Sequence, residues 1–82
     1  MRLDKYLKVS RLIKRRTVAC EACELGKVTL NGRVAKPSAD VKEGDTIAIT
    51  FGEKTTTVKV EKVVEHALKA DASDMYSIID QH

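Results

Sequence analysis

The chain has 82 residues, with 15 Lys and Arg against 12 Asp and Glu and a formal net charge of +3. This length suits one small domain with a modest core, and it is too short for a second domain or for a substrate pocket of ordinary size. Charged residues are frequent in the first residues of the chain, and no long apolar run follows. We therefore expect a cytoplasmic protein that does not enter a membrane.

The positive charge is concentrated at the amino-terminal end. Residues 1–16 contain seven basic side chains and one acidic one, residues 17–64 contain seven of each sign, and residues 65–82 contain one basic and four acidic side chains. The three segments therefore carry charges of +6, 0 and −3. A basic front with an acidic tail is typical of a protein that meets a polyanion with one end only.

The stretch from Arg2 to Ile13 predicts an amphipathic helix with a basic outer face. At about 100° per residue its less polar side chains fall within one arc; they are Leu3, Tyr6, Leu7, Ser10 and Ile13. Only Asp4 and Lys8 form an oppositely charged i,i+4 pair. The other cations lack helical partners of opposite charge, so we expect phosphate to balance them.

A second helix is predicted to begin near Thr17. Thr is a favoured N-cap residue, and Val18, Ala22 and Leu25 recur at helical spacing as one apolar stripe. Gly26 can adopt the left-handed conformation that closes a helix. The tripeptide directly before this helix is the densest basic run of the chain, Lys14-Arg15-Arg16. Its guanidinium groups and the free amides of the helix start are suited to phosphate oxygens.

The remainder of the chain predicts a small antiparallel sheet. Residues 28–30 alternate as a short strand, and Asn31-Gly32 predicts a type I′ turn that folds the chain back. Thr46–Phe51 alternates cleanly, and Thr55–Val64 is a β-rich return strand. The segment Met75–Ile79 is compatible with a closing strand or a short helix. The fold class expected is α+β, with two helices packed on the sheet.

Cys20 and Cys23 form a CxxC pattern that suggests a redox or zinc site. The remaining candidate ligands, His66 and His82, are far along the chain and not at ligand spacing. The pattern also lies inside a predicted helix rather than at a helix start after a strand. We therefore interpret both thiols as structural, and we expect no metal and no cofactor.

Several motifs together resemble the RNA-binding domain first described in small-subunit ribosomal protein four, the S-four domain. The resemblance covers about residues 1–51 and rests on an ordered set of motifs: Arg2-Leu3-Asp4 with Leu7, Arg16-Thr17, Gly26-Lys27-Val28, Asn31-Gly32 and Val41–Asp45. It implies the alpha-L RNA-binding motif, in which two helices pack on a small, bent antiparallel sheet. It also implies that RNA binds across the helix pair and the loop between the helices.

Among stand-alone members of this family, the chain is most similar to the RqcP group of bacterial ribosome-associated quality-control factors, and more distantly to the fifteen-kilodalton heat-shock proteins. That resemblance implies binding to large ribosomal subunits obstructed by peptidyl-tRNA, with contacts to rRNA and tRNA. It further implies support of the partner RqcH in adding alanine tails to stalled chains. We expect no enzymatic activity of its own and a monomeric protein.

Carried over by position, Arg2 and Arg16 are the strongest candidates for RNA contact, and Asp4 is expected to orient a neighbouring arginine. The full set of predicted RNA-binding residues is Arg2, Lys8, Arg11, Lys14, Arg15 and Arg16. The predicted domains are residues 1–64 for the RNA-binding unit and 65–82 for an acidic extension. Two alternatives remain open: a small thiol redox or metal-binding protein using the two cysteines, and an adaptor whose basic helix meets an acidic protein.

Overall fold

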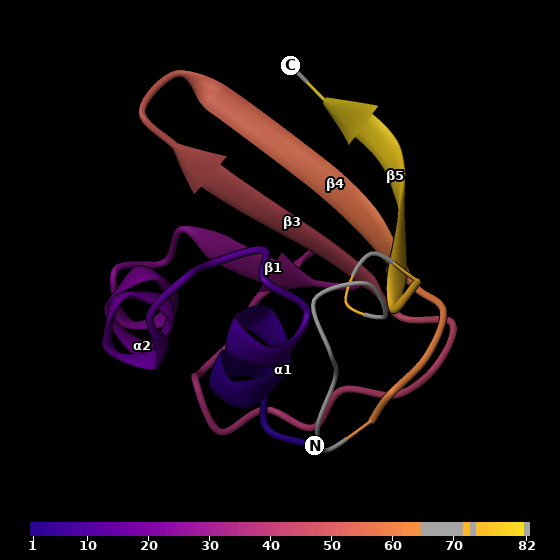
Figure 1. Ribbon diagram of the computed structural model, residues 1–82. Coiled ribbons are helices and arrows are strands. Elements are labelled where there is room, and N and C mark those ends of the chain that lie inside the picture. Colours follow the sequence, from indigo (N-terminus) through magenta and orange to yellow (C-terminus); the bar gives the residue numbers. More distant parts are fainter. Residues whose placement is uncertain (65–71, 73, 82) are drawn as a thin grey trace.

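The computed structural model describes residues 1–64, 72 and 74–81. Its helices and strands are α1 (Leu3–Val9), α2 (Arg16–Glu24), β1 (Val28–Leu30), β2 (Arg33–Val34), β3 (Thr46–Phe51), β4 (Lys54–Val60) and β5 (Tyr76–Gln81). The strands form one sheet in the order β2-β1-β3-β4-β5, and each neighbouring pair is antiparallel. Figure 1 shows α1 and α2 on the same side of a curved sheet, with the β3–β4 hairpin extending past them. The expected α+β class is confirmed.

Helix α1 is shorter than the sequence predicted. It ends at Val9, and Arg11 adopts a left-handed backbone with φ of 63°. The backbone amide of Ile13 then donates to the carbonyl of Leu7 at 3.0 Å, which turns the chain back over the helix end. The predicted inward arc is nevertheless confirmed, because all five of its members are buried: Leu3, Tyr6, Leu7, Ser10 and Ile13.

Helix α2 begins one residue earlier than expected, and the prediction that Thr17 is its N-cap is wrong. The N-cap is Arg15, whose backbone is extended, and no side chain caps this end. Thr17 therefore lies within the first turn. Its hydroxyl is not used in the way the N-cap prediction assumed.

The apolar stripe predicted for α2 is wrong in two of its three positions. Val18 is exposed and Leu25 is 70% exposed, whereas the buried residues are Ala19, Ala22 and Cys23. These three small side chains occur at i, i+3 and i+4, so they share one face of the helix. Small residues let α2 lie close to its neighbours, and a pattern search weighted towards Val and Leu overlooks such a face.

The predicted hairpin between β1 and β2 is confirmed. Asn31 and Gly32 have φ of 53° and 84°, as a type I′ turn requires. The turn is also tied to β3, because the amide of Thr46 donates to Asn31 Oδ1 at 2.9 Å and Asn31 Nδ2 donates to Asp45 Oδ1 at 3.1 Å. The β1–β2 hairpin is thereby fixed against the centre of the sheet.

The sheet presents one face to the helices. Ile47 and Ile49 on β3 and Val58 and Val60 on β4 are buried on this face. The alternation of β3 also places Phe51 with Ile47 and Ile49, but Phe51 at the end of the strand is exposed. Strand β4 covers residues 54–60 and stops before the predicted end at residue 64. The alternation thus predicts the inward face well, but it overestimates how far the strand extends.

The carboxyl-terminal segment adds the fifth strand, so the strand alternative for Met75–Ile79 is the one observed. Tyr6 of α1 is buried, and its hydroxyl donates to the carbonyl of Met75 at 2.6 Å. This bond connects the first helix to the residue directly before β5. The boundary proposed at residues 64 and 65 remains a prediction. Within the described part of the chain, no helix is long and apolar enough to cross a membrane.

Candidate functional site

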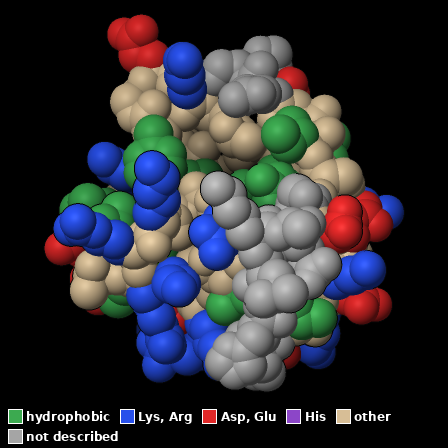
Figure 2. Space-filling model, viewed as in Figure 1, with side chains coloured by type: hydrophobic (Ala, Val, Ile, Leu, Met, Phe, Trp, Pro, Cys, Tyr) green, Lys and Arg blue, Asp and Glu red, His purple; other side chains and the backbone are tan. Residues whose placement is uncertain are grey.

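Six basic side chains around the helix pair form the candidate site, which we call the basic surface. All six are exposed, and they come from the start and outer face of α1, from the turn between the helices and from the first residue of α2: Arg2, Lys8, Arg11, Lys14, Arg15 and Arg16. On the face shown in Figure 2, many Lys and Arg side chains gather on the side where α1 and α2 lie in Figure 1. That these six residues bind RNA remains a prediction.

Asp4 joins the two arginines ranked highest from the sequence. Its carboxylate is buried, and it accepts hydrogen bonds from Arg2 Nε at 3.2 Å, Arg2 Nη2 at 3.3 Å and Arg16 Nε at 3.4 Å. The backbone amide of Lys5 donates to the same carboxylate at 2.8 Å. Residues 14 positions apart in sequence are therefore held at one point on the surface. The expected orienting role of Asp4 agrees with this geometry.

The two arginines keep part of their binding capacity despite this pairing. The side chain of Arg2 is 53% exposed and that of Arg16 is 48% exposed. A guanidinium group has five N–H donors in a planar fork. Arg2 uses two of them on Asp4 and Arg16 uses one. The remaining donors are available to planar or tetrahedral anions such as phosphate.

The other four cations of the basic surface have no such partner in the part of the chain that the structure describes. Among the described residues, no carboxylate forms an ion pair with Lys8, Arg11, Lys14 or Arg15. Exposed like charges close in sequence repel one another, and none of the described carboxylates offsets this repulsion by pairing with these four side chains. Such an arrangement of charge attracts polyanions.

Backbone geometry at the turn between the helices shapes the same surface. Arg11 occupies a left-handed conformation that costs most residues about 1–2 kcal/mol relative to glycine. The first amides of α2 follow Arg15 without a side-chain cap, so they have no side-chain acceptor from the N-cap. Uncapped amides at a helix start favour anions. The turn therefore combines basic side chains with backbone donors.

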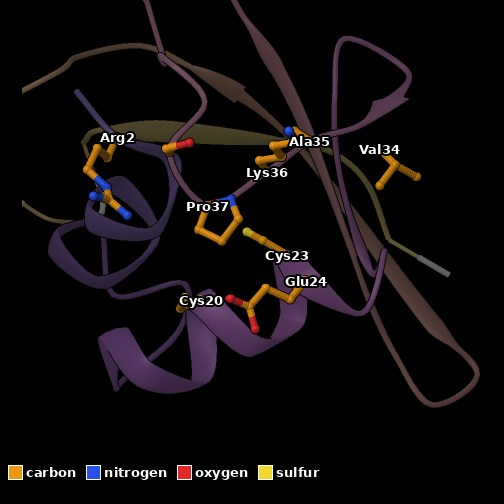
Figure 3. A pocket seen from close by; sticks show the side chains of 9 residues that line it. Arg2, Cys20, Cys23, Glu24, Val34, Ala35, Lys36 and Pro37 are labelled. Atoms are coloured by element: carbon orange, nitrogen blue, oxygen red, sulfur yellow. Dashed lines mark hydrogen bonds between the residues drawn. The ribbon is translucent and has the colours of Figure 1, made fainter.

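A groove that no sequence motif predicts lies beside the basic surface. It has a volume of about 630 Å³ and is lined by residues of α2 and of the chain that follows β1, together with Arg2: Cys20, Cys23, Glu24, Val34, Ala35, Lys36, Pro37 and Ser38. In Figure 3, Arg2 and Val34 lie at opposite ends of the labelled set, with Pro37 and Cys23 between them. Residues 20–24 and 34–38 are brought together only by the fold, so no local motif marks the pair.

Both thiols border this groove, and neither has the properties of a reactive thiol. Burial raises the pKa of Cys23 to about 11, and desolvation, followed by the carboxylate of Glu24, raises the pKa of Cys20. A redox-active cysteine requires the opposite direction, because the thiolate is the reactive form. No group of three metal-ligating side chains occurs among the residues that the structure describes. These observations favour the structural interpretation of the CxxC pattern.

Comparison with known families now identifies the fold family. The S4 domain matches residues 1–47, which is more than half of the chain and includes the whole basic surface. The chain belongs to the S4 domain family. The resemblance inferred from the sequence motifs is therefore confirmed.

Relatives extend the match beyond the S4 domain itself. An RQC P-site tRNA stabilizing factor of Listeria monocytogenes is 57% identical over 81 residues, which is 99% of this chain and 88% of the relative. A factor of the same name from Bacillus subtilis is 49% identical over 81 residues, covering 99% of this chain and 94% of the relative. Within the S4 domain family, the chain thus falls in the RqcP group, as the sequence resemblance indicated.

A solved structure shows the same fold at lower identity. The trimeric structure of Heat Shock Protein 15 from Vibrio cholerae superposes with a TM-score of 0.88 and 35% identity, and the match covers 95% of this chain and 80% of that protein. The expected, more distant relation to the fifteen-kilodalton heat-shock proteins is confirmed. This S4 protein therefore shares its architecture with a protein that was solved as a trimer.

Proposed function

We propose that this S4 protein is an RNA-binding factor of ribosome-associated quality control that acts by binding rather than by catalysis. The observation that carries the proposal is the near full-length match to relatives named RQC P-site tRNA stabilizing factors. The exposed cations of the basic surface, four of them without an ion pair to a described carboxylate, support it on independent physical grounds. The target is a large ribosomal subunit obstructed by peptidyl-tRNA.

The basic surface is suited to folded RNA rather than to single strands. Proteins that bind single strands without sequence preference stack bases on aromatic side chains, and this chain has only two Tyr and one Phe. Of these, Tyr6 is fully buried. Structured RNA is recognised largely through phosphates and 2′-hydroxyl groups, which exposed Arg and Lys side chains reach. We propose that Arg2 and Arg16 contact rRNA or tRNA, and that Lys8, Arg11, Lys14 and Arg15 contribute further phosphate contacts.

The proposed role includes partners and a cellular location. We propose that the protein works in the cytoplasm with RqcH, and that its binding of peptidyl-tRNA supports the addition of alanine tails to stalled chains. We also propose that it acts as a monomer, in contrast to the trimer named for the Vibrio cholerae structure. Sedimentation equilibrium of the purified protein tests the monomer proposal, which a concentration-independent trimer mass would contradict.

A sucrose-gradient profile of a cell lysate tests the central proposal. We expect the protein in the fractions of free large subunits, together with peptidyl-tRNA, and we expect nuclease treatment to release it. The protein-adaptor alternative predicts that its partners survive nuclease treatment. Sedimentation only at the top of the gradient, under conditions that cause ribosomes to stall, would contradict the proposed function.

A further inference from the structure

The groove beside Arg2 combines an apolar interior with few polar groups. Pro37, the buried Cys23 and the exposed Val34 supply apolar surface, while Arg2, Lys36 and Glu24 supply charges. Its volume of about 630 Å³ is in the ordinary range for small-ligand pockets, so the expectation that so short a chain has no pocket of that size is wrong. Such a lining suits a flat, partly apolar ligand with an attached anionic group.

Glu24 is the residue that general attraction to RNA does not explain. It is exposed at the end of α2, and its described contact is with the thiol of Cys20, whose Sγ lies 3.6 Å from Glu24 Oε1. No basic side chain among the described residues pairs with it. A carboxylate beside a phosphate-binding surface repels phosphate. A bound group that carries N–H donors offsets this repulsion, because a carboxylate is a strong hydrogen-bond acceptor.

We propose that the groove holds one unpaired nucleotide of the bound RNA, whose base carries an exocyclic amino group. The base lies against Pro37 and Val34, and its amino group donates to Glu24. Its phosphates lie against Arg2 and Lys36. The inference rests on the proposed function and deepens it, because it adds recognition of a base to contacts that otherwise read only the RNA backbone.

Continuity with the basic surface argues for a nucleotide over other ligands. Arg2 belongs to both the groove and the basic surface, and Asp4 fixes it beside Arg16. RNA phosphates that follow the basic surface therefore pass the mouth of the groove. Unpaired bases of folded RNA are commonly splayed out and bound on their hydrogen-bonding edges. An acidic peptide would be attracted by Arg2 and Lys36 but repelled by Glu24.

The decisive test compares Glu24→Ala with Glu21→Ala in binding to purified large ribosomal subunits. Both variants remove one negative charge from an exposed position of α2, but Glu21 does not line the groove. General electrostatics predicts that both variants bind as well as the original protein or more tightly. The proposal predicts that Glu24→Ala binds about tenfold more weakly, because alanine offers no acceptor to the amino group of the base, and that Glu21→Ala does not.

Two further pairs of variants test the other residues that line the groove. Lys36→Ala should weaken binding more than Lys59→Ala. Both variants remove one positive charge, but Lys36 lines the groove and Lys59 lies on β4 outside it. Val34→Ser should weaken binding more than Val18→Ser, because Val18 is exposed on α2 but does not line the groove. Circular dichroism and thermal unfolding verify that each variant is folded.

The outcomes separate this inference from the proposed function. If the original protein does not bind large subunits, the proposed function fails, and the inference that rests on it fails with it. If the protein binds and Glu24→Ala binds equally well or more tightly, the inference is overturned while the proposed function stands. Weaker binding by Glu24→Ala, with Glu21→Ala no weaker than the original protein, supports both.

Discussion

At the scale of single residues, the site depends on one buried carboxylate. Asp4 accepts hydrogen bonds from Arg2 and Arg16 and from the amide of Lys5. It lowers the net charge of the basic surface by one, which by itself weakens attraction to RNA. In return it fixes two guanidinium groups that would otherwise move independently. Pre-ordered side chains lose less conformational entropy when they bind.

Asp4→Asn separates these two effects. If charge alone mattered, the variant would bind RNA more tightly. We expect weaker binding, because the amide offers one acceptor oxygen where the carboxylate offers two, and the arginines lose their common anchor. We also expect the free energy of unfolding to fall by about 1–3 kcal/mol. Equilibrium binding to large subunits and urea unfolding measure the two quantities, with Glu53→Gln at the β3–β4 turn as the control for charge. Tighter binding by Asp4→Asn would contradict the orienting role.

At Arg11 the stability of the fold and the proposed binding of RNA favour different residues. Its left-handed backbone favours glycine, and its side chain belongs to the basic surface. We expect Arg11→Gly to increase the free energy of unfolding by up to about 1 kcal/mol, because glycine relieves the strain. We expect the same variant to bind RNA more weakly. Arg11→Ala, which removes the charge without relieving the strain, should lose binding and gain no stability. Urea unfolding and subunit binding check both expectations.

Cys23 provides a test against the thiol alternative. The pKa of about 11, against an ordinary value of 9.0, means that the folded thiolate fraction at neutral pH is lower by about 100-fold. We expect iodoacetamide to modify Cys23 far more slowly in the native protein than in urea. Because the folded pKa is raised, the contribution of Cys23 to stability is present below pH 9 and is lost as the pH rises towards 11. Modification as fast as in the unfolded chain would support a reactive thiol.

At the scale of elements, the sequence predicts what periodicity and turn chemistry determine. The inward arc from Leu3 to Ile13, the Asn31-Gly32 turn and the limits of β3 agree with the structure. The buried face of α2 does not follow from the sequence, because alanine and cysteine give a weak hydrophobic signal. The sequence also does not predict the groove, because the segments that line it meet only in the folded chain.

The link between α1 and the segment before β5 is tested by Tyr6→Phe. The Tyr6 hydroxyl donates to the carbonyl of Met75, which also accepts from the amides of Glu61 and Lys62. Because that carbonyl keeps two donors, the variant leaves no buried acceptor unpaired. We expect a loss of about 1 kcal/mol in the free energy of unfolding. Tyr76→Phe serves as the control in urea unfolding. A loss above 3 kcal/mol would show that the hydroxyl does more than donate one bond.

At the scale of the whole molecule, the charge of the chain is segregated by segment while the fold is held by an aliphatic core. Residues 1–16 carry a charge of +6, and among the described residues Asp4 is the one charged residue that is buried. Stability and binding therefore depend largely on different residues. This separation predicts that basic side chains can be replaced without unfolding the protein, so that binding can be measured on folded variants.

The dissociation constant for large ribosomal subunits, measured over a range of salt concentrations, tests the central claim most directly. With about four to six phosphate contacts, the original protein should give a log–log slope of the association constant near −3 to −5. The folded double variant Arg2→Ala/Arg16→Ala should bind at least about 100-fold more weakly, with a slope shallower by about 1.5. Lys54→Ala/Lys59→Ala, which removes two cations from β4, should retain the original slope. If the folded Arg2/Arg16 variant keeps both the affinity and the slope of the original protein, the basic surface is not the RNA-binding site.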